Sequence, residues 1–129
     1  MRLFIELFVR DLSISRHFYA HILGMKVTRD QPDYVSLASE EAQINLCPIG
    51  DLDEGHYLLQ SDGPLANKVE ICLETTKLQS IYDAVVAAKG TVYEPITDRP
   101  WNRTDFRIID PDGAYIRVTT PVHPDPSTQ

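Results

Sequence analysis

The sequence lacks several features that would place it in a specialised class of protein. Only two of its 129 residues are cysteine, no apolar run reaches membrane-spanning length, and lysine and arginine form no cluster. These shortages disfavour a disulfide-built mini-protein, a transmembrane protein and a nucleic-acid-binding protein. The first residues are interrupted by Glu6 and lack the apolar core of a secretory signal, so we expect a cytoplasmic protein with two reduced thiols.

What is present resembles an ordinary globular domain. Hydrophobic residues make up 43% of the chain and charged residues 24%, which predicts a packed core. The formal net charge is −7, and such acidity disfavours contact with nucleic acid or anionic membranes. It keeps a protein soluble, and it leaves open the attraction of a cationic ligand.

The first half of the chain alternates between strand and helix patterns. Asp11 follows the first apolar strand, where a helix N-cap would accept hydrogen bonds from free backbone amides. Ile14, Phe18 and Ile22 recur every four residues and predict a helix with one buried stripe, which Gly24 ends in a left-handed cap. The predicted strands cover residues 4–9, 25–29, 34–38 and 42–47, which gives a βαβββ order.

The second half repeats this order after a polar loop. A helix is predicted over residues 77–89, with Leu78, Ile81, Val85 and Ala88 on its buried face and Gly90 as its stop. The predicted strands cover residues 69–74, 91–94, 105–109 and 115–119, the last two joined by the turn Asp110-Pro111-Asp112-Gly113.

The expected fold is therefore α+β, with two βαβββ modules forming a curved mixed sheet around a cup and the helices on the outer face. We expect one domain over residues 1–120, with module 1 at about 1–47, a linker at about 48–68 and module 2 at about 69–120. Residues 121–129 contain three prolines and are expected to form a flexible tail.

Alternation along the strands separates two faces, because successive residues of a strand point to opposite sides of the sheet. The apolar face, which we expect to pack on the helices, carries Ile5, Leu7, Val9, Val35, Leu37, Ile44, Leu46, Ile71, Leu73, Phe106, Ile108, Ile116 and Val118. The opposite face mixes aromatic, amide and charged side chains, a composition typical of a small-molecule pocket.

Several segments resemble the vicinal-oxygen-chelate superfamily, which includes glyoxalase I, extradiol dioxygenases and bleomycin-type resistance proteins. The segments that carry the resemblance are Val9-Arg10-Asp11-Leu12, Phe18-Tyr19, Leu23-Gly24-Met25, Trp101 with Asp105-Phe106, and Asp110-Pro111-Asp112-Gly113. The resemblance spans nearly the whole chain, and it implies paired βαβββ modules, ligand sites in the cups and a homodimer.

This sequence departs from the superfamily pattern at the positions that hold the metal ligands. Carried onto this sequence by the resemblance, they are Phe4, Asn45, Glu70 and Arg117. Phe4 offers no donor atom, Asn45 offers one neutral oxygen and Arg117 would add a positive charge beside a cation. We therefore expect no metal and no other cofactor, and we expect Glu70 and Arg117 to form an ion pair across neighbouring strands.

For other candidate residues, a functional role must be weighed against a purely structural one. His17 and His21 have a zinc-compatible spacing, but they flank the helix stripe and are interpreted as surface residues. His56 lies in a linker that could cover a cup, and Trp101 lies in a loop at the expected rim, suited to stacking on a planar ligand. The predicted ligand-binding residues are Phe4, Glu6, Phe8, Tyr34, Asn45, Cys47, His56, Glu70, Trp101, Arg107, Tyr115 and Arg117.

The favoured functional hypothesis is a metal-independent protein that sequesters an aromatic or planar small molecule. The alternative is an enzyme of lyase, isomerase or dioxygenase type, either with Glu70 as the catalytic residue or with a divalent metal relocated around Glu6, Glu70 and His56. A third alternative is an interaction domain whose cups are filled by its own side chains. Glu74 is the remaining carboxylate that could act as a general base.

Overall fold

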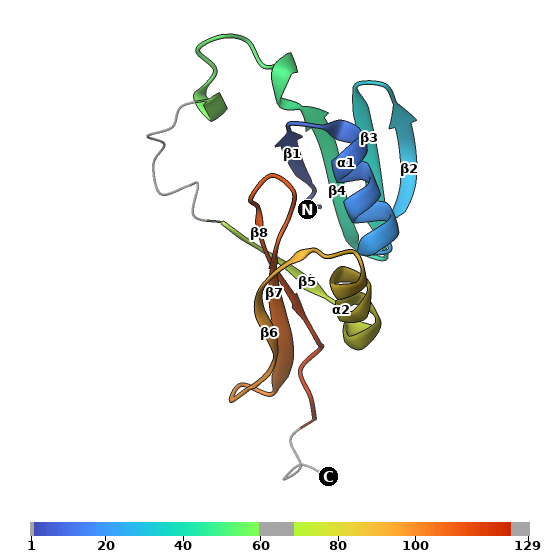
Figure 1. Ribbon diagram of the computed structural model, residues 1–129, viewed down its shortest axis with the longest axis vertical. Coiled ribbons are helices and arrows are strands. Elements are labelled where there is room, and N and C mark those ends of the chain that lie inside the picture. The colour runs from blue at the N-terminus through green and yellow to red at the C-terminus, as the bar shows by residue number, and fades with distance from the viewer. Residues whose placement is uncertain (1, 60–68, 125–129) are drawn as a thin grey trace. The chain divides into compact units, whose positions relative to one another are not determined.

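A computed structural model describes residues 2–59 and 69–124 of the chain. The chain divides into two compact units, Met1–Val69 and Glu70–Gln129, each with one four-stranded sheet and one helical region (Figure 1). Both units have the order βαβββ, so the predicted α+β class and the two modules are confirmed. The extent of a single domain over residues 1–120 stays a prediction.

In the first unit, which we call module 1, the outer strand β1 is parallel to its neighbour and the other pairs are antiparallel. The strand order is β1-β4-β3-β2. Its elements are β1 (Ile5–Val9), α1 (Leu12–His17), a π-helical segment (Phe18–Ile22), β2 (Lys26–Gln31), β3 (Tyr34–Ser39) and β4 (Ala42–Pro48).

The first helix begins as predicted but buries a different stripe. Asp11 caps it, accepting a 3.1 Å hydrogen bond from the backbone amide of Ile14, and Gly24 ends it with a φ of 80°. The predicted burial of Ile14 is wrong, because its side chain lies on the solvent side and 55% of the residue is exposed. The wide π-helical turn after α1 lets adjacent Phe18 and Tyr19 both pack inward, which centres the buried face away from Ile14.

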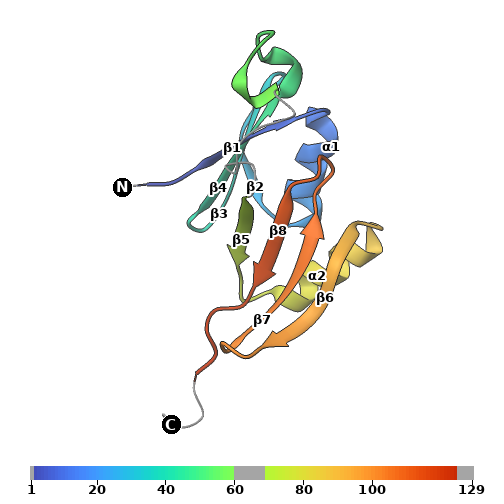
Figure 2. The same cartoon turned by 90° about the vertical axis from the view of Figure 1, so that its left-hand side faces the viewer.

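The second unit, module 2, repeats this arrangement with the order β5-β8-β7-β6 (Figure 2). Strand β5 is parallel to β8, and the remaining pairs are antiparallel. Its elements are β5 (Glu70–Glu74), α2 (Leu78–Ala87), β6 (Thr91–Arg99), β7 (Arg103–Ile109) and β8 (Tyr115–Thr119).

Strand β6 is longer than the sequence predicted. Pro95 falls where the register with β7 shifts between Glu94 and Thr97, so it disturbs the pairing without ending the strand. The strand continues to Arg99 and forms a hairpin with β7. Trp101 therefore lies in the loop before β7, as predicted, and this loop is the tip of the β6–β7 hairpin.

The end of α2 also differs from the prediction. Lys89 adopts the left-handed conformation, with a φ of 57°, whereas Gly90 does not. Glycine is needed at position 90 for space, since a Cβ atom there would lie 2.9 Å from Cγ1 of Val85. Ala88, predicted on the buried face, is exposed because α2 ends at Ala87, before that position.

The apolar faces of the two sheets form the cores of the modules. In module 2 the ring of Tyr82 on α2 meets Phe106 of β7 edge-on, with 5.0 Å between ring centroids. Whether this face is the outer side of a cup stays a prediction. No helix among the described residues is long and apolar enough to cross a membrane. The most deeply buried members of the predicted apolar face are Val9, Val35, Leu37, Ile44, Leu46, Phe106, Ile108, Ile116 and Val118.

The predicted linker and tail each contain ordered parts. The linker forms short 3₁₀ turns at Ile49–Asp51 and Tyr57–Leu59, and residues 60–68 lie outside the described chain. At the start of the predicted tail, the backbone amide of His123 donates a 2.7 Å hydrogen bond to the carbonyl of Asn102. This tethers residue 123 to the β6–β7 hairpin, while residues 125–129 are not described.

Candidate functional site

The polar faces of the two sheets carry matching positions. In module 1, Asn45 pairs with Glu6 on one side and with Ser36 on the other. In module 2, Arg117 occupies the same register position, between Cys72 and Arg107. One module therefore places a neutral amide where the other places a cation.

The polar face of module 2 is built around Glu70. The Nε atom of Arg117 donates a 2.5 Å hydrogen bond to Oε1 of Glu70, so the predicted ion pair is confirmed. Arg107 binds the other oxygen, with its Nε atom 3.3 Å from Oε2. One carboxylate thus receives two guanidinium groups from β7 and β8.

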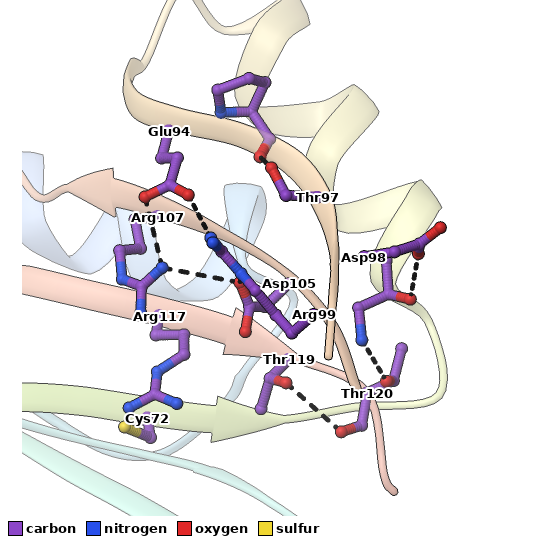
Figure 3. A network of polar contacts seen from close by, with 12 residues as sticks. Cys72, Glu94, Thr97, Asp98, Arg99, Asp105, Arg107, Arg117, Thr119 and Thr120 are labelled. Atoms are coloured by element: carbon purple, nitrogen blue, oxygen red, sulfur yellow. Dashed lines mark hydrogen bonds and ion pairs between the residues drawn. The ribbon is translucent and has the colours of Figure 1, made fainter. Parts of the chain in front are cut away.

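The network extends from Arg107 along the sheet toward the β6–β7 hairpin (Figure 3). Nη1 of Arg107 lies 3.4 Å from Oε2 of Glu94, and Glu94 also pairs with Arg99. Nε of Arg99 donates a 2.8 Å hydrogen bond to Oδ1 of Asp105. We call Glu70, Glu94, Asp105, Arg99, Arg107 and Arg117 the arginine–carboxylate network; it contains three cations and three anions.

Asp105 is the most deeply buried member of this network, with none of its side chain exposed. Its Oδ2 atom has no hydrogen-bond partner among residues 2–59 and 69–124. The second guanidinium, of Arg107, lies 3.6 Å from Oδ1. Two nearby positive charges are the physical reason that a carboxylate can stay at a buried position.

The pKa of Glu70 is set by opposing effects. Desolvation of this partly buried carboxyl raises its pKa, but the hydrogen bonds and charges of Arg117 and Arg107 together outweigh desolvation. The net result is a pKa below the ordinary value of 4.5, so Glu70 is ionised near neutral pH.

Glu70→Gln is expected to lower the free energy of unfolding by about 2 kcal/mol near neutral pH, because charged hydrogen bonds to two arginines are lost. A carboxyl whose pKa is lowered by folding stabilises the protein above its unfolded pKa and loses that contribution as the pH falls through its folded pKa. The difference between parent and variant should therefore shrink below pH 4.5. Urea unfolding across this range measures it, with exposed Glu41→Gln as control; a gap that does not narrow in acid would contradict the assignment.

Aromatic side chains lie at both ends of this face. The rings of Tyr115 and Tyr93 meet edge-on, with centroids 5.6 Å apart, and Tyr93 is exposed. At the hairpin, the guanidinium of Arg99 lies 6.0 Å from the centroid of the Trp101 ring, which is also exposed. Tyr115, a predicted ligand-binding residue, thus contacts Tyr93. Trp101 contacts Arg99, which belongs to the arginine–carboxylate network.

The polar face of module 1 has a smaller cluster. The thiol of Cys47 donates a 3.2 Å hydrogen bond to Oε1 of Glu6. Desolvation, followed by this hydrogen bond and the charge of Glu6, raises the pKa of Cys47 to about 12. Desolvation and hydrogen bonding to Glu6 also raise the pKa of Tyr34. Both groups are therefore protonated and neutral near neutral pH.

An open hollow of about 550 Å³ adjoins this cluster. It gathers the predicted residues Phe8, Tyr34 and Cys47 at one place. The other residues that line it are Arg29, Gln31, Asp33, Asp51 and Leu52.

Several predicted residues make local contacts outside these two clusters. Phe4 precedes β1 and is exposed, and Asn45 is buried, where its Oδ1 accepts a 3.4 Å hydrogen bond from Gln43. Nδ1 of His56 accepts a 3.1 Å hydrogen bond from the amide of Leu58 within the linker. Glu74, a candidate base, pairs with Arg103 at 2.7 Å.

Sequence reasoning missed Tyr93, Glu94, Arg99 and Asp105 as site residues. Asp105 precedes Phe106 of the predicted apolar face and therefore shares the polar face with the predicted residue Arg107, so alternation along the strand was a signal for it. Tyr93 and Glu94 share a register irregularity in β6, between Val92 and Glu94, which simple alternation does not reveal.

The positions associated with metal ligation do not suit a divalent cation. Phe4 has no donor, Asn45 is already bonded, and Glu70 is bound to two guanidinium groups, one of them from Arg117. Among the residues that the structure describes, no three His, Cys, Asp or Glu side chains are grouped so that they could hold a metal ion.

Comparison with known proteins shows which family this chain resembles. A family model described as the glyoxalase/bleomycin resistance protein/dioxygenase superfamily matches residues 3–118. A protein named Glyoxalase 1 from Caenorhabditis briggsae is 26% identical over 116 residues, 87% of this chain and 40% of that protein. The chain therefore spans about two fifths of the length of that curated relative.

Solved structures share the fold over nearly the whole chain. The integron cassette protein VCH_CASS1 from the mobile metagenome of V. cholerae has a TM-score of 0.70 at 25% identity, covering 93% of this chain and 94% of its own. TioX from Micromonospora sp. ML1 has a TM-score of 0.74 at 15% identity, covering 93% and 98%. Because the family match extends across both modules, this chain belongs to the glyoxalase/bleomycin resistance protein/dioxygenase superfamily.

Proposed function

We propose that this protein binds a planar or aromatic small molecule without a metal ion, and that it sequesters the molecule without converting it. The observation that carries the proposal is the pairing of Glu70 with Arg117 and Arg107. Glu70 is the one strong ligand among the four family positions, and two bound cations compete with any divalent ion for its oxygens.

The protonation states of the polar side chains also favour binding over catalysis. A general base works best with a pKa near the working pH, and the pKa of Glu70 is lowered below its ordinary value. A nucleophilic cysteine needs a thiolate, and the raised pKa of Cys47 keeps its thiol protonated. Exposed aromatic rings at Tyr93 and Trp101 offer stacking surfaces for a planar ligand.

The experiment combines metal analysis with ligand titration. Protein purified without chelators is analysed for nickel, zinc, iron and manganese, and the fluorescence of Trp101, the single tryptophan, is then followed across a panel of aromatic antibiotics and metabolites. We expect far less than one metal ion per chain, and saturable quenching by at least one compound that EDTA does not change.

Variants test whether the bound compound depends on the arginine–carboxylate network. Arg117→Ala is expected to weaken binding, whereas Arg16→Ala, which removes an arginine paired with Asp30 on the helix side, should leave binding unchanged. Stoichiometric metal, loss of binding in EDTA, or the absence of quenching by any compound would each overturn the proposal.

The similarity to a protein named Glyoxalase 1 favours a second candidate function, a lyase or isomerase. In this candidate Glu70 would move a proton while Arg117 orients the substrate. Mass spectrometry of compounds incubated with the parent and with Glu70→Gln separates the two functions. A product formed by the parent and not by the variant would favour catalysis over sequestration.

A further inference from the structure

The hollow of module 1 combines aromatic walls with negative charge. Phe8 on β1 and Tyr34 on β3 supply the rings, and Asp33 and Asp51 stand at its exposed edge. Neither aspartate makes a side-chain hydrogen bond or ion pair to another residue of the described chain. Ligands bind preferentially where apolar walls meet a few placed polar groups.

The negative charge of this hollow is not neutralised locally. Glu6, which accepts the hydrogen bond of the Cys47 thiol, adds a third carboxylate, and Arg29 is the single cation among the described residues that line the hollow. The pKa of Cys47 responds to all three carboxylates, which shows that their field converges on this place. The contrast with module 2 is clear, because three arginines there balance three carboxylates.

The chain itself shows how a planar cation sits in this hollow. The guanidinium of Arg29 lies over the ring of Tyr34, 5.0 Å from its centroid, and its Nη2 atom donates a 3.1 Å hydrogen bond to Gln31. A flat, delocalised cation against an aromatic face is the arrangement that the ring quadrupole favours. Arg29 therefore occupies a stacking position that a ligand of the same chemistry could share or take over.

We propose that the hollow of module 1, lined by Phe8, Tyr34, Asp33 and Asp51, binds planar organic cations. The ligand stacks on Tyr34 and Phe8, its positive charge faces the two aspartates, and it competes with Arg29 for the ring of Tyr34. This inference goes beyond the proposed function, because it assigns a class of ligand to the hollow of module 1, whereas the proposed function rests on the arginine–carboxylate network of module 2.

The test compares two probes of nearly equal shape. Proflavine is a planar cation near neutral pH, and acridine is its uncharged analogue in mildly alkaline buffer. Binding to the full chain is measured by fluorescence anisotropy and calorimetry at low and high salt. We expect proflavine to bind more tightly than acridine, and its advantage to diminish at high salt because the charges at the rim are exposed to screening.

Two variants test whether the probe binds in the hollow. The double variant Asp33→Asn with Asp51→Asn should weaken proflavine binding about tenfold, since two exposed charge pairs are lost, and should leave acridine binding unchanged. Arg29→Ala should strengthen proflavine binding about threefold, because the resident cation is removed. Asp53→Asn and Lys26→Ala are the matched controls, one exposed acid and one exposed base of the same module that do not line the hollow.

The outcomes separate this inference from the proposed function. If proflavine binds but the paired aspartate variant and Arg29→Ala behave like the controls, the cation site is not this hollow and the inference is overturned. If acridine binds as tightly as proflavine, the protein takes planar molecules without regard to charge; the proposed function then stands and the inference fails. If Asp53→Asn weakens proflavine binding as much per charge as the paired aspartate variant does, and Lys26→Ala strengthens it as much as Arg29→Ala does, attraction by the general acidity of the chain replaces the proposed site.

Discussion

Replacing Asp105 by asparagine is expected to lower the free energy of unfolding by about 3 kcal/mol. The carboxylate is fully buried, accepts a 2.8 Å hydrogen bond from Arg99 and lies 3.6 Å from Arg107. Removing its charge leaves two guanidinium groups close together, each with less than a fifth of its side chain exposed. Glu94 still pairs with both of them and Glu70 still pairs with Arg107, which keeps the expected loss at the lower end for a broken buried ion pair.

Urea unfolding followed by circular dichroism measures this loss. The control is Asp83→Asn on α2, an exposed carboxylate that accepts a 2.9 Å hydrogen bond from Gln79; its expected cost is below about 0.5 kcal/mol. In the double variant with Arg99→Gln, part of the stability should return, because two arginines of the network then face two carboxylates instead of three facing two. Equal stability of Asp105→Asn and the parent would show that the network adds nothing to folding.

Much of the fold and the central ion pair could be predicted from the sequence. The family resemblance implies that β5 and β8 are neighbours, and alternation along each strand places Glu70 and Arg117 on one face. Side chains as long as glutamate and arginine then meet without further information. The same reasoning assigned the buried residues of the apolar faces, which local periodicity alone determines.

The rest of the arginine–carboxylate network depends on irregularities in the strands and helices that the period of the apolar residues does not reveal. Arg99 reaches Asp105 only because β6 continues past Pro95 and turns back in a hairpin. A proline and a polar segment are ordinarily signs of a strand end, so the sequence placed Arg99 in a loop. Ile14 was misplaced for a related reason, since a π-helical turn changes the period on which the helix stripe was calculated.

The sequence alone also does not show how positive and negative side chains are distributed over the two modules. The chain as a whole has a net charge of −7, yet the polar face of module 2 balances three cations with three anions. The hollow of module 1 instead holds Asp33 and Asp51, and of the side chains placed by the structure, Arg29 is the one cation that lines it with them. The acidity noted in the composition therefore becomes informative only when the strand register shows where it is concentrated.

Iodoacetamide is expected to alkylate Cys47 about fifty times more slowly in the folded protein than in urea, in mildly alkaline buffer. Folding raises the pKa of this thiol from 9.0 to about 12, mainly through desolvation and then through its hydrogen bond to Glu6. The thiolate population falls about a thousandfold, and the greater nucleophilicity of a more basic thiolate recovers about twentyfold of this. The net slowing distinguishes a partly buried, protonated thiol from an activated one.

A single-thiol protein makes this measurement unambiguous. Cys72→Ser leaves Cys47 as the one cysteine, and mass spectrometry follows its modification with time. Adding Glu6→Gln should accelerate the reaction several-fold without restoring the unfolded rate, because desolvation, the largest cause of the raised pKa, remains. Glu41→Gln, an exposed change in the same module, should have no effect. Alkylation of the folded protein at the unfolded rate would mean that Cys47 is not held against Glu6, and would reopen a nucleophilic role for this cysteine.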